Sequence, residues 1–387
     1  MRIAIVFDCV FPSTKGGVER VLRGYAEEWA AQGHEVRYLT RRQASAEEPA
    51  IPGVQVEAIA GSADLYDETG TRRLGPALGF ALALLVALFR RRRAFDAVYV
   101  AATPAVNVLA ARAGLVGTRT VLLTEWVEVW RREQWLEYSG PLVGRLAGAA
   151  QALAIRLSRR SVVNSQLHGD RLLALHHRGR VFVTPGLLPD DEELGARAQL
   201  DLPERAQLLF VGRHIPDKKV ELVPAVVAEL RRAGRDVTAV VTGDGPTRAD
   251  AVDRARALGV EDVCSFPGFV GQEQLDELMR SSSCLLHPSI REGYGLVVVE
   301  AAAAGTPVVV AAAPDNAAAE LVTDGVNGYV AEGADVDALS RAVASALDGG
   351  ADLRRTTRTW FESTARLGTV RASAQGILGA LLDPAQR

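Results

Sequence analysis

The stretch LLHPSIREGYGLVVVEAAAAG, residues 285–305, carries the strongest signal in this 387-residue chain. Its first residues are apolar and end a predicted strand. Residues 287–295 are then too rich in glycine, proline and polar side chains for a strand or a helix. The apolar run that follows, residues 296–304, is interrupted only by Glu300 and predicts a buried helix. The sequence therefore predicts a strand, a loop and a helix in that order.

A glycine-rich loop that leads into a helix is a potential anion site, because backbone N–H groups point outward there and the helix dipole favours negative charge. Glu292 lies in the loop, and Glu300 lies about two helical turns further on. A carboxylate in so apolar a helix needs a partner, since burying it unpaired is very costly, and sugar hydroxyls are suitable partners. We expect a ligand that carries both a phosphate and hydroxyl groups. The alternative is an ordinary turn followed by a solvated glutamate.

The combination resembles the E-x7-E signature of retaining, nucleotide-sugar-dependent glycosyltransferases with the GT-B fold, especially glycosyltransferase family 4. Glu292 and Glu300 are the two ends of that signature. The first four of the seven residues between them are Gly293, Tyr294, Gly295 and Leu296. The resemblance implies an α/β protein of two Rossmann-like parallel-sheet domains facing across a cleft. It also implies transfer of a sugar, with retention, from a nucleoside-diphosphate sugar to an acceptor hydroxyl.

Composition restricts the other classes of function. A formal net charge of −3 gives no electrostatic reason to expect nucleic acid as a partner. Three cysteines without paired spacing fit a reducing compartment and offer no zinc site. The first residues read as a strand and not as a signal peptide, and no apolar run is long enough for a membrane span. We expect a cytoplasmic protein, and the Ala, Arg and Gly content suggests a bacterial source.

Strands alternate with helices through both halves, which predicts two parallel sheets. Residues 1–186 are expected to form an N-terminal, acceptor-side domain, residues 187–200 a linker, and residues 201–362 a C-terminal, donor-binding domain. The resemblance implies that a last helix, about residues 363–387, packs back on the first domain.

The first predicted strand runs into a loop that ends in Gly16 and Gly17 before a helix. Such a loop lies at the carboxyl end of a strand, where open α/β sheets bind ligands. No G-x-G-x-x-G motif is present, which weakens the alternative of a dehydrogenase. The resemblance assigns Gly16 and Gly17 to contacts with the donor phosphates and the acceptor.

Arg213 and Lys218 follow the first predicted strand of the second half. A sugar nucleotide leaves as a diphosphate, and cations of this kind stabilise the growing negative charge. We therefore expect no metal and no other cofactor, and no D-x-D motif lies at a strand end. The resemblance makes these two residues the diphosphate ligands and, with Glu292, the catalytic residues. Lys219 is the competitor of Lys218.

The resemblance also assigns the remaining donor contacts. Gly243 and Val270, in turns after two further strands, are expected near the nucleobase. Glu300 is expected to bind the ribose hydroxyls, and Glu292 the transferred sugar. The loop amides that would contact phosphate or sugar are those of Tyr294, Gly295 and Leu296.

Aromatic and acidic residues follow the strand predicted at residues 120–124. The candidates for an acceptor surface are Glu125, Trp126, Glu128 and Trp130. The alternative is that these tryptophans pack a loop onto the domain. The family often has a histidine here, and Trp126 or Val127 occupies its place. Two alternatives follow: Glu125 or Glu128 substitutes for the histidine, or the chemistry does not need it.

Residues 74–93, from Leu74 to Arg93, form an apolar helix that ends in four arginines. A packed helix of the domain with a solvated cluster of charges is the expected explanation. The alternative is peripheral contact with a membrane, and with it a lipid-linked acceptor. His168, His176 and His177 have no partner at metal-ligand spacing and are expected on the surface.

Two other functions fit the same pattern: a nucleotide-sugar epimerase or hydrolase with no sugar acceptor, and a regulatory sugar-nucleotide binder. A glycan, a lipid or a small molecule could each serve as the acceptor of a transferase.

Overall fold

A computed structural model describes residues 1–14, 16–43, 50–67, 71–184, 186–187, 201–365 and 368–382, and the chain divides into two compact units. Unit 1 is Met1–Pro189 with Gly368–Arg387, and unit 2 is Asp190–Leu367. The expected linker, residues 187–200, lies outside the described residues except for Leu187. The return to unit 1 comes later than residue 363, because helix α12 (Gly350–Ala365) belongs to unit 2.

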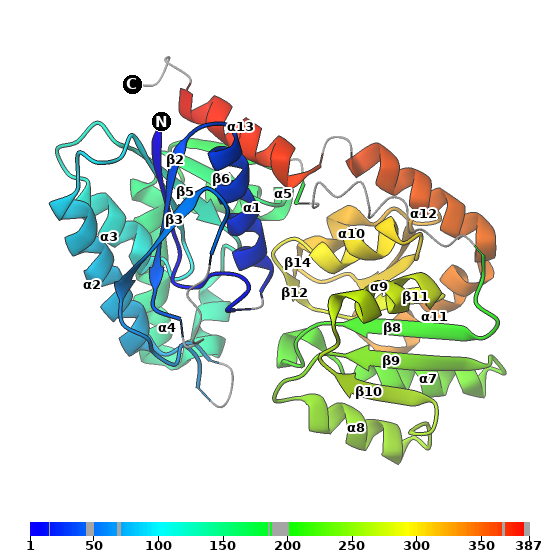
Figure 1. The fold of residues 1–387 in the computed structure, drawn as a ribbon. Helices are drawn as coiled ribbons and strands as arrows, with labels where there is room; N and C mark the ends of the chain where they lie inside the picture. The colour runs from blue at the N-terminus through cyan, green and yellow to red at the C-terminus, as the bar shows by residue number, and fades with distance from the viewer. Residues whose placement is uncertain are drawn as a thin grey trace. The chain divides into compact units, whose positions relative to one another are not determined.

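Unit 1 is built on a seven-stranded parallel sheet with the order β3-β2-β1-β4-β5-β6-β7 (Figure 1). The strands are β1 (Arg2–Val6), β2 (Glu35–Arg41), β3 (Val54–Ala60), β4 (Ala97–Ala101), β5 (Val121–Trp126), β6 (Arg160–Val163) and β7 (Arg180–Val183). The central strands β1 and β4 are almost continuous apolar runs, as expected of strands that are covered on both faces.

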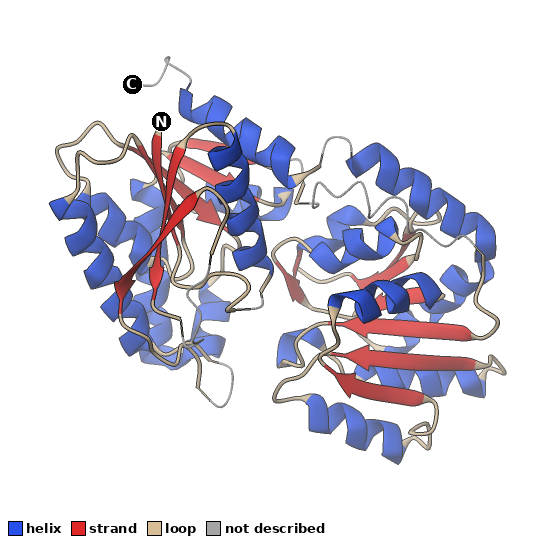
Figure 2. Cartoon of the chain, viewed as in Figure 1, coloured by secondary structure: helices blue, strands red, loops and turns tan. Residues whose placement is uncertain are grey.

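Helices cover both faces of this sheet (Figure 2). They are α1 (Gly17–Ala31), α2 (Leu74–Arg90), α3 (Val106–Gly114), α4 (Arg132–Leu157), α5 (Gln166–Ala174) and α13 (Val370–Leu382). Buried residues of α2, α3 and α4 share one core with the sheet. On the other face α13 packs against α1, where Trp29 Nε1 donates to the carbonyl of Ala374 at 3.0 Å. The last helix therefore completes unit 1.

Unit 2 contains a six-stranded parallel sheet with the order β10-β9-β8-β11-β13-β15. Its strands are β8 (Ala206–Val211), β9 (Val237–Thr242), β10 (Cys264–Gly268), β11 (Cys284–His287), β13 (Val308–Ala311) and β15 (Gly328–Ala331). Its helices, besides α12, are η1 (Pro216–Lys218), α7 (Leu222–Arg232), α8 (Arg248–Ala257), α9 (Gln272–Ser281), α10 (Leu296–Ala303), η2 (Ala317–Leu321) and α11 (Val336–Asp348). One core lies under α7, α8 and α11, and a second under α9, α10 and η2.

The expectation that residues 287–295 are irregular is wrong at two points. His287 ends β11, and Arg291–Glu292 forms a short strand, β12, that pairs in parallel with β14 (Asp315–Asn316). The pairing places Glu292 opposite Asn316. Two residues are too few to show the alternation typical of a strand. Strand β12 therefore depends on its pairing with the distant β14.

Candidate functional site

The candidate site of unit 2 lies where the order of its strands reverses. The connection that leaves β8 leads to β9 on one side, whereas β11 pairs with β8 on the other. At such a point the loops beyond the carboxyl ends of the two strands diverge and leave room for a ligand. The loop after β8 carries Arg213 and η1 with Lys218, and the loop after β11 carries Glu292.

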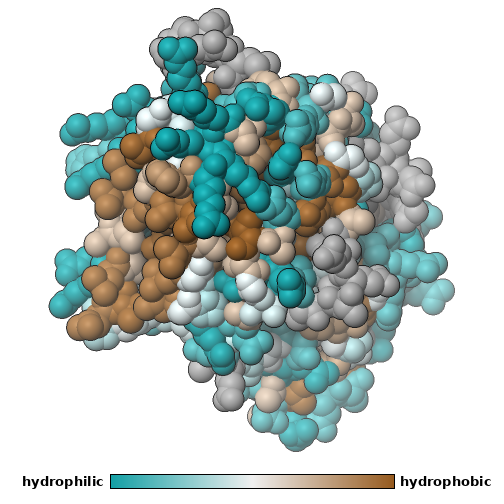
Figure 3. All heavy atoms as spheres, turned by 60° about the vertical axis from the view of Figure 1, so that its left-hand side comes forward, coloured by the Kyte–Doolittle hydropathy of each residue, from teal (hydrophilic) through white to brown (hydrophobic). Residues whose placement is uncertain are grey.

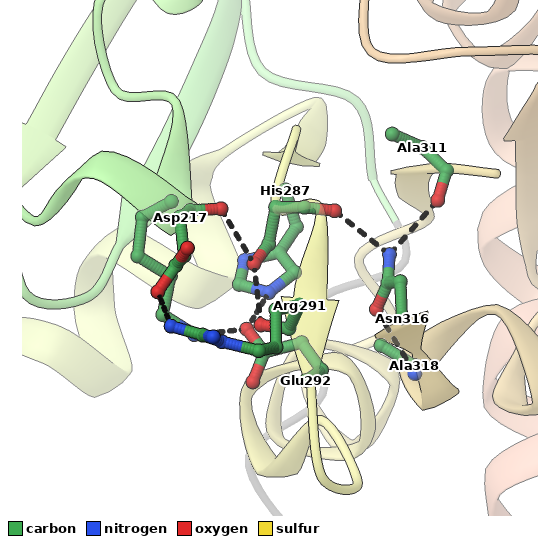
Figure 4. A network of polar contacts seen from close by, with 9 residues as sticks. Asp217, His287, Arg291, Glu292, Ala311, Asn316 and Ala318 are labelled. Atoms are coloured by element: carbon green, nitrogen blue, oxygen red, sulfur yellow. Dashed lines mark hydrogen bonds and ion pairs between the residues drawn. The ribbon is translucent and has the colours of Figure 1, made fainter. Parts of the chain in front are cut away.

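An ion pair joins these two loops. Lys218 Nζ contacts Glu292 Oε1, and His287 Nε2 lies 2.5 Å from the same oxygen. The Lys218 side chain is 16% exposed and that of Glu292 is 14% exposed, so solvent reaches the pair only in part. Figure 4 shows the Glu292 carboxylate pointing toward the His287 ring. The sequence predicted Lys218 and Glu292, and the structure brings them together.

The electrostatics of Glu292 favour the charged carboxylate. Burial alone would raise the pKa of Glu292, but the charges of Lys218 and His287, with their hydrogen bonds, lower that pKa well below its usual range. His287 Nδ1 is buried and finds no hydrogen-bond partner among the described residues. Sequence reasoning missed His287; its signal is a titratable residue at the end of an apolar strand, five positions before Glu292.

A second group of polar contacts holds the Glu292 loop. The Asp217 carboxylate pairs with Arg291, and its backbone carbonyl accepts from Ile290 N at 2.9 Å and Ser289 Oγ at 3.2 Å (Figure 4). Because Asp217 lies in η1 beside Lys218, these bonds fasten the two loops of the site to each other. None of these residues was predicted from the sequence.

Asn316 fastens the same loop from the other side. Its Nδ2 donates to the carbonyls of Ser289 at 2.9 Å and Ala311 at 2.8 Å, and its Oδ1 accepts from Ala318 N at 3.1 Å. The side chain is 3% exposed, so each of these bonds is protected from water. Asn316 thus supports Glu292, its partner across the β12–β14 pair.

The helix start that follows requires a glycine. Gly295 caps α10 with φ of 106°, and a Cβ added there would lie 2.6 Å from the Cβ of Ala318. Only glycine adopts this conformation readily and fits this space. Gly293 is buried, whereas Tyr294, Leu296 and, further along α10, Glu300 are partly exposed. The predicted donor contacts of the loop therefore lie on one helix start.

The two lysines of the loop after β8 differ. Lys218 pairs with Glu292. Lys219 follows the last residue of η1 in the left-handed region, with φ of 50°, and has no ion pair with the residues that the structure describes. Arg213 is exposed, and its guanidinium likewise contacts no described acid. The geometry therefore favours Lys218 over Lys219 as the partner of Glu292.

Gly243 and Val270 lie in neighbouring loops. Gly243 N donates to the carbonyl of Gly268 at 2.8 Å, and Val270 follows two residues after Gly268. Gly243 has φ of 110°, and an added Cβ would lie 1.9 Å from the carbonyl oxygen of Gly212. Glycine is needed here so that the loops after β8 and β9 can pack backbone to backbone.

In unit 1, Gly16 caps α1 and Gly17 is its first residue, which places the predicted glycine pair at a helix start. The carboxylate of Glu19 lies beside it, because a Cβ added to Gly16 would be 2.2 Å from Glu19 Oε2. A carboxylate of the protein itself thus lies against this end of the helix dipole. Glu19 was not singled out from the sequence.

The predicted acceptor surface of unit 1 needs correction. Trp126 and Glu125 are each 1% exposed, and Trp126 Nε1 donates to Ser161 Oγ at 3.1 Å within the core. Neither residue can offer a surface to an acceptor. Glu128 and Trp130 are partly exposed and hydrogen-bonded to each other, at 2.5 Å between Trp130 Nε1 and Glu128 Oε2.

Burial also determines the chemistry of Glu125. It raises the pKa of the Glu125 carboxyl to about 7, and hydrogen bonds with Asn164 and Tyr99 offset this only in part. Glu125 precedes Trp126 in β5, so its side chain lies on the opposite face of the sheet from that of Trp126. A carboxyl in this position is partly protonated near neutral pH.

The expectation of surface histidines is wrong for two of the three. His168 is 1% exposed and accepts from Val129 N at 3.1 Å, and His177 is 7% exposed with Nε2 2.8 Å from Ser161 Oγ. His168 thus holds the segment after β5, whereas His177 bonds to β6. Within the described part of the chain, no group of three or more His, Cys, Asp or Glu residues is arranged to hold a metal ion.

The family model of the glycosyl transferases group 1 matches residues 192–360, and that of the glycosyl transferase 4-like domain matches residues 16–186. The D-inositol 3-phosphate glycosyltransferase of Streptomyces avermitilis is 35% identical over 222 residues, which are 53% of this chain and 47% of that protein. This chain thus spans about half the length of that relative.

Solved structures agree on the fold. The sucrose-phosphate synthase of Thermosynechococcus elongatus has a TM-score of 0.79 at 18% identity and covers 100% of both chains. The complex of Anabaena Alr3699/HepE with UDP has a TM-score of 0.73 at 19% identity, over 98% of this chain and 99% of that one. The parallel sheets of the two units are those of the GT-B fold, and the chain belongs to the group 1 and 4-like glycosyltransferases, the family that its paired glutamates predict.

Proposed function

We propose that this protein is a retaining glycosyltransferase that moves a sugar from a nucleoside-diphosphate sugar to an acceptor hydroxyl. The observation that supports the proposal most strongly is the ion pair of Lys218 with Glu292 where the strand order of unit 2 reverses. It places a cation and a charged carboxylate where open α/β sheets bind ligands. A sugar diphosphate needs both: a cation for its phosphates and an acceptor for its hydroxyls.

In this proposal Lys218 and Arg213 bind the diphosphate. A lysine ammonium has three N–H donors, so Lys218 can contact Glu292 and a phosphate oxygen together. Both cations stabilise the charge that grows on the leaving oxygen, which makes the reaction independent of metal. The diphosphate oxygen then takes the acceptor proton on the same face of the sugar, which gives retention.

Glu292 would contact the transferred sugar. Lys218 and His287 both act on Oε1 and keep the carboxylate charged, so it can accept from a sugar hydroxyl and stabilise positive charge at the reacting carbon. Glu300 would accept from the ribose hydroxyls. Gly243 and Val270 would contact the base, while Tyr294, Gly295 and Leu296 contribute backbone amides.

Location and acceptor form part of the same proposal. We place the protein in the bacterial cytoplasm, with peripheral contact to the inner membrane face through residues 74–93. A glycan, a lipid-linked sugar or a small molecule would supply the hydroxyl, and Glu128 with Trp130 lie partly exposed after β5 to meet it. The neighbour Alr3699/HepE is known in complex with UDP-glucose, which makes uridine donors the first to test.

A thermal-shift screen of nucleoside diphosphates and their sugars, with EDTA present, tests the proposal. A ligand that binds the native state must raise the unfolding midpoint. We expect a rise for the sugars of one base and its loss in Glu300→Ala. No rise with any of them would contradict the proposal, and consumption of the donor without an acceptor would favour an epimerase or hydrolase instead.

A further inference from the structure

Helix α2 of unit 1 is apolar on the side that faces solvent as well as on the side that faces the core. Its inner side buries Phe80, Leu84 and Leu88. Its outer side exposes Leu74 (52%), Leu78 (49%), Leu82 (63%), Val86 (39%) and Phe89 (56%). A helix that is apolar all round is normally covered all round. The outer side of α2 is therefore exposed, although its apolar sequence is typical of a buried helix surface.

The apolar surface continues over the two neighbouring helices. Helix α3 packs between α2 and α4 on this face of the sheet. Val116, just after α3, is 64% exposed, and the part of α4 after its kink at Gly140 exposes Leu142 (73%), Leu146 (66%), Leu153 (48%) and Leu157 (40%). We call these outward side chains of α2, α3 and α4 the α2–α4 face. Figure 3 shows a broad brown patch on this side of the molecule, with teal side chains along it.

The exposed charges near the C-terminal ends of these helices are mostly basic. Glu57 pairs with Arg91 at 2.5 Å beside α2, and the acidic residues of α4, Glu133 and Glu137, lie before its kink. Between Thr71 and Thr124 the sequence has a single acidic residue, Asp96, and that residue pairs with Arg2 at 2.8 Å. Residues 139–169 contain no acidic residue. The exposed arginines near the C-terminal ends of the three helices are Arg90, Arg92, Arg93, Arg119, Arg156 and Arg159. Since each helix leads into the next parallel strand, these ends lie at the same edge of the layer.

We propose that the α2–α4 face docks unit 1 on an anionic lipid surface, with the leucines in the headgroup and acyl boundary and the arginines on lipid phosphates. A large exposed apolar patch edged by cations is typical of an interfacial membrane contact. A two-fold contact that aligns the C-terminal ends of the helices of two copies would bring arginines against arginines, which disfavours that pairing of two copies. No helix among the described residues is long and apolar enough to cross a membrane, so the contact is peripheral.

The inference rests on the peripheral location proposed above, and extends it from one helix to three and to a class of lipid. It does not depend on the donor. Flotation with vesicles of phosphatidylcholine, with and without phosphatidylglycerol, therefore tests it separately from a thermal shift with the donor. We expect the wild-type protein to bind the anionic vesicles at low salt and to release as salt rises.

The apolar half of the α2–α4 face is tested by Leu78→Ser with Leu82→Ser. Both side chains are exposed, so the fold is unaffected, and the loss of their burial in lipid should weaken vesicle binding about tenfold or more. Leu202→Ser is the matched control, since Leu202 is 53% exposed and lies in unit 2. Equal vesicle binding by the double variant and the wild type would overturn the proposal.

The basic half is tested by Arg90→Gln with Arg92→Gln and Arg93→Gln. At about 1 kcal/mol for each arginine at an anionic surface, binding should fall about 100-fold on anionic vesicles and hardly change on neutral ones. Arg254→Gln with Arg256→Gln, two exposed arginines of α8, is the control. The proposal is also overturned if the wild-type protein ignores anionic vesicles, or if sedimentation shows a dimer that Leu78→Ser with Leu82→Ser dissolves.

Discussion

Two glutamates at the carboxyl edge of two parallel sheets have opposite electrostatic settings. Glu125 in β5 of unit 1 is 1% exposed and forms no ion pair with the residues that the structure describes, and burial raises its pKa to about 7. Glu292 in β12 of unit 2 is held by Lys218 and His287, which lower its pKa well below the usual range in spite of burial. Partners, and not burial, decide which of the two carries a charge.

The difference separates a carboxyl that belongs to the core from one that is prepared for a ligand. A charged, partly exposed carboxylate with a cation at its side can exchange partners with a polar ligand at little cost. Glu125 is 1% exposed and offers no such surface to a ligand. Because the two pKa values shift in opposite directions, the two glutamates change stability with pH in opposite ways. Glu292 adds to the free energy of unfolding above about pH 4.5, and this contribution is lost as pH falls.

The largest effect is expected from Glu292→Gln. The amide keeps the shape and can still accept from His287, but it removes the charge that faces the transferred sugar. Turnover of the donor should fall about 100- to 1000-fold, as when one transition-state contact is lost. Steady-state kinetics with the donor found by thermal shift provides the measurement.

Glu125→Gln is the matched control, since it makes the same chemical change at the same edge of the other sheet. Its turnover should stay within about threefold of the wild type, well under 1.4 kcal/mol. Equal losses in the two variants would remove the distinction between the two glutamates.

Glu125→Gln should instead change stability in a pH-dependent way. The folded-state pKa of about 7 exceeds the ordinary value of 4.5, so the native protein keeps a proton that the unfolded chain releases between these pH values. Stability of the wild type therefore falls as pH rises from 4.5 to 7 and stays low above. The variant should lack this fall and be more stable at pH 8, by at most about 3 kcal/mol. Urea unfolding at several pH values measures the free energy of unfolding of the two proteins. The same pH dependence in both would show that Glu125 does not have a raised pKa.

Lys218→Met and Lys219→Met sharpen the comparison within the loop after β8. Loss of a charged contact to the diphosphate should weaken donor binding about 10- to 100-fold in Lys218→Met. Lys219→Met should stay within about twofold, because Lys218 and not Lys219 forms the pair with Glu292 that the proposal assigns to the donor. Calorimetric titration of the donor measures both. Lys218→Arg keeps the charge and should lose less donor affinity than Lys218→Met. If Lys219→Met lost more affinity than Lys218→Met, Lys219 and not Lys218 would be the ligand of the diphosphate.

The smallest effect concerns the two helix starts. Gly295→Ala meets a positive φ and the Cβ of Ala318, and should cost about 1–3 kcal/mol of unfolding free energy. Gly16→Ala has an extended φ of −136° and meets only the flexible end of Glu19, so about 1 kcal/mol or less is expected. Denaturant midpoints of the two variants give the comparison, and an equal loss in both would show that α10 starts without strain.

Much of the fold could be predicted because its signals are local. Apolar β-branched runs alternate with helical spacing, and that alternation predicts parallel sheets. Lys218, Glu292 and the glycine at position 295 each lie just after a predicted strand or before a predicted helix. The pattern gives these positions, and the resemblance to the E-x7-E signature singled out the residues among them.

The rest depends on contacts between distant residues. Nothing local shows that Asn316 will hold the Glu292 loop, or that Asp217 and Arg291 will pair across 74 positions. Trp126 was expected to meet an acceptor, but β6 supplies Ser161 to its indole nitrogen and closes the core over it. His168 and His177 were placed on the surface for the same reason, since helical spacing does not show which neighbour covers a polar side chain.

The central claim is that unit 2 binds the donor through the Lys218–Glu292 pair. Calorimetric titration of UDP-, ADP-, GDP- and dTDP-glucose, in EDTA, into the wild type, Lys218→Met and Glu125→Gln tests it most directly. We predict that one of these sugars binds the wild type and Glu125→Gln with equal affinity and binds Lys218→Met at least about tenfold more weakly. Equal affinity for all three proteins, or binding lost in Glu125→Gln and kept in Lys218→Met, would contradict the claim.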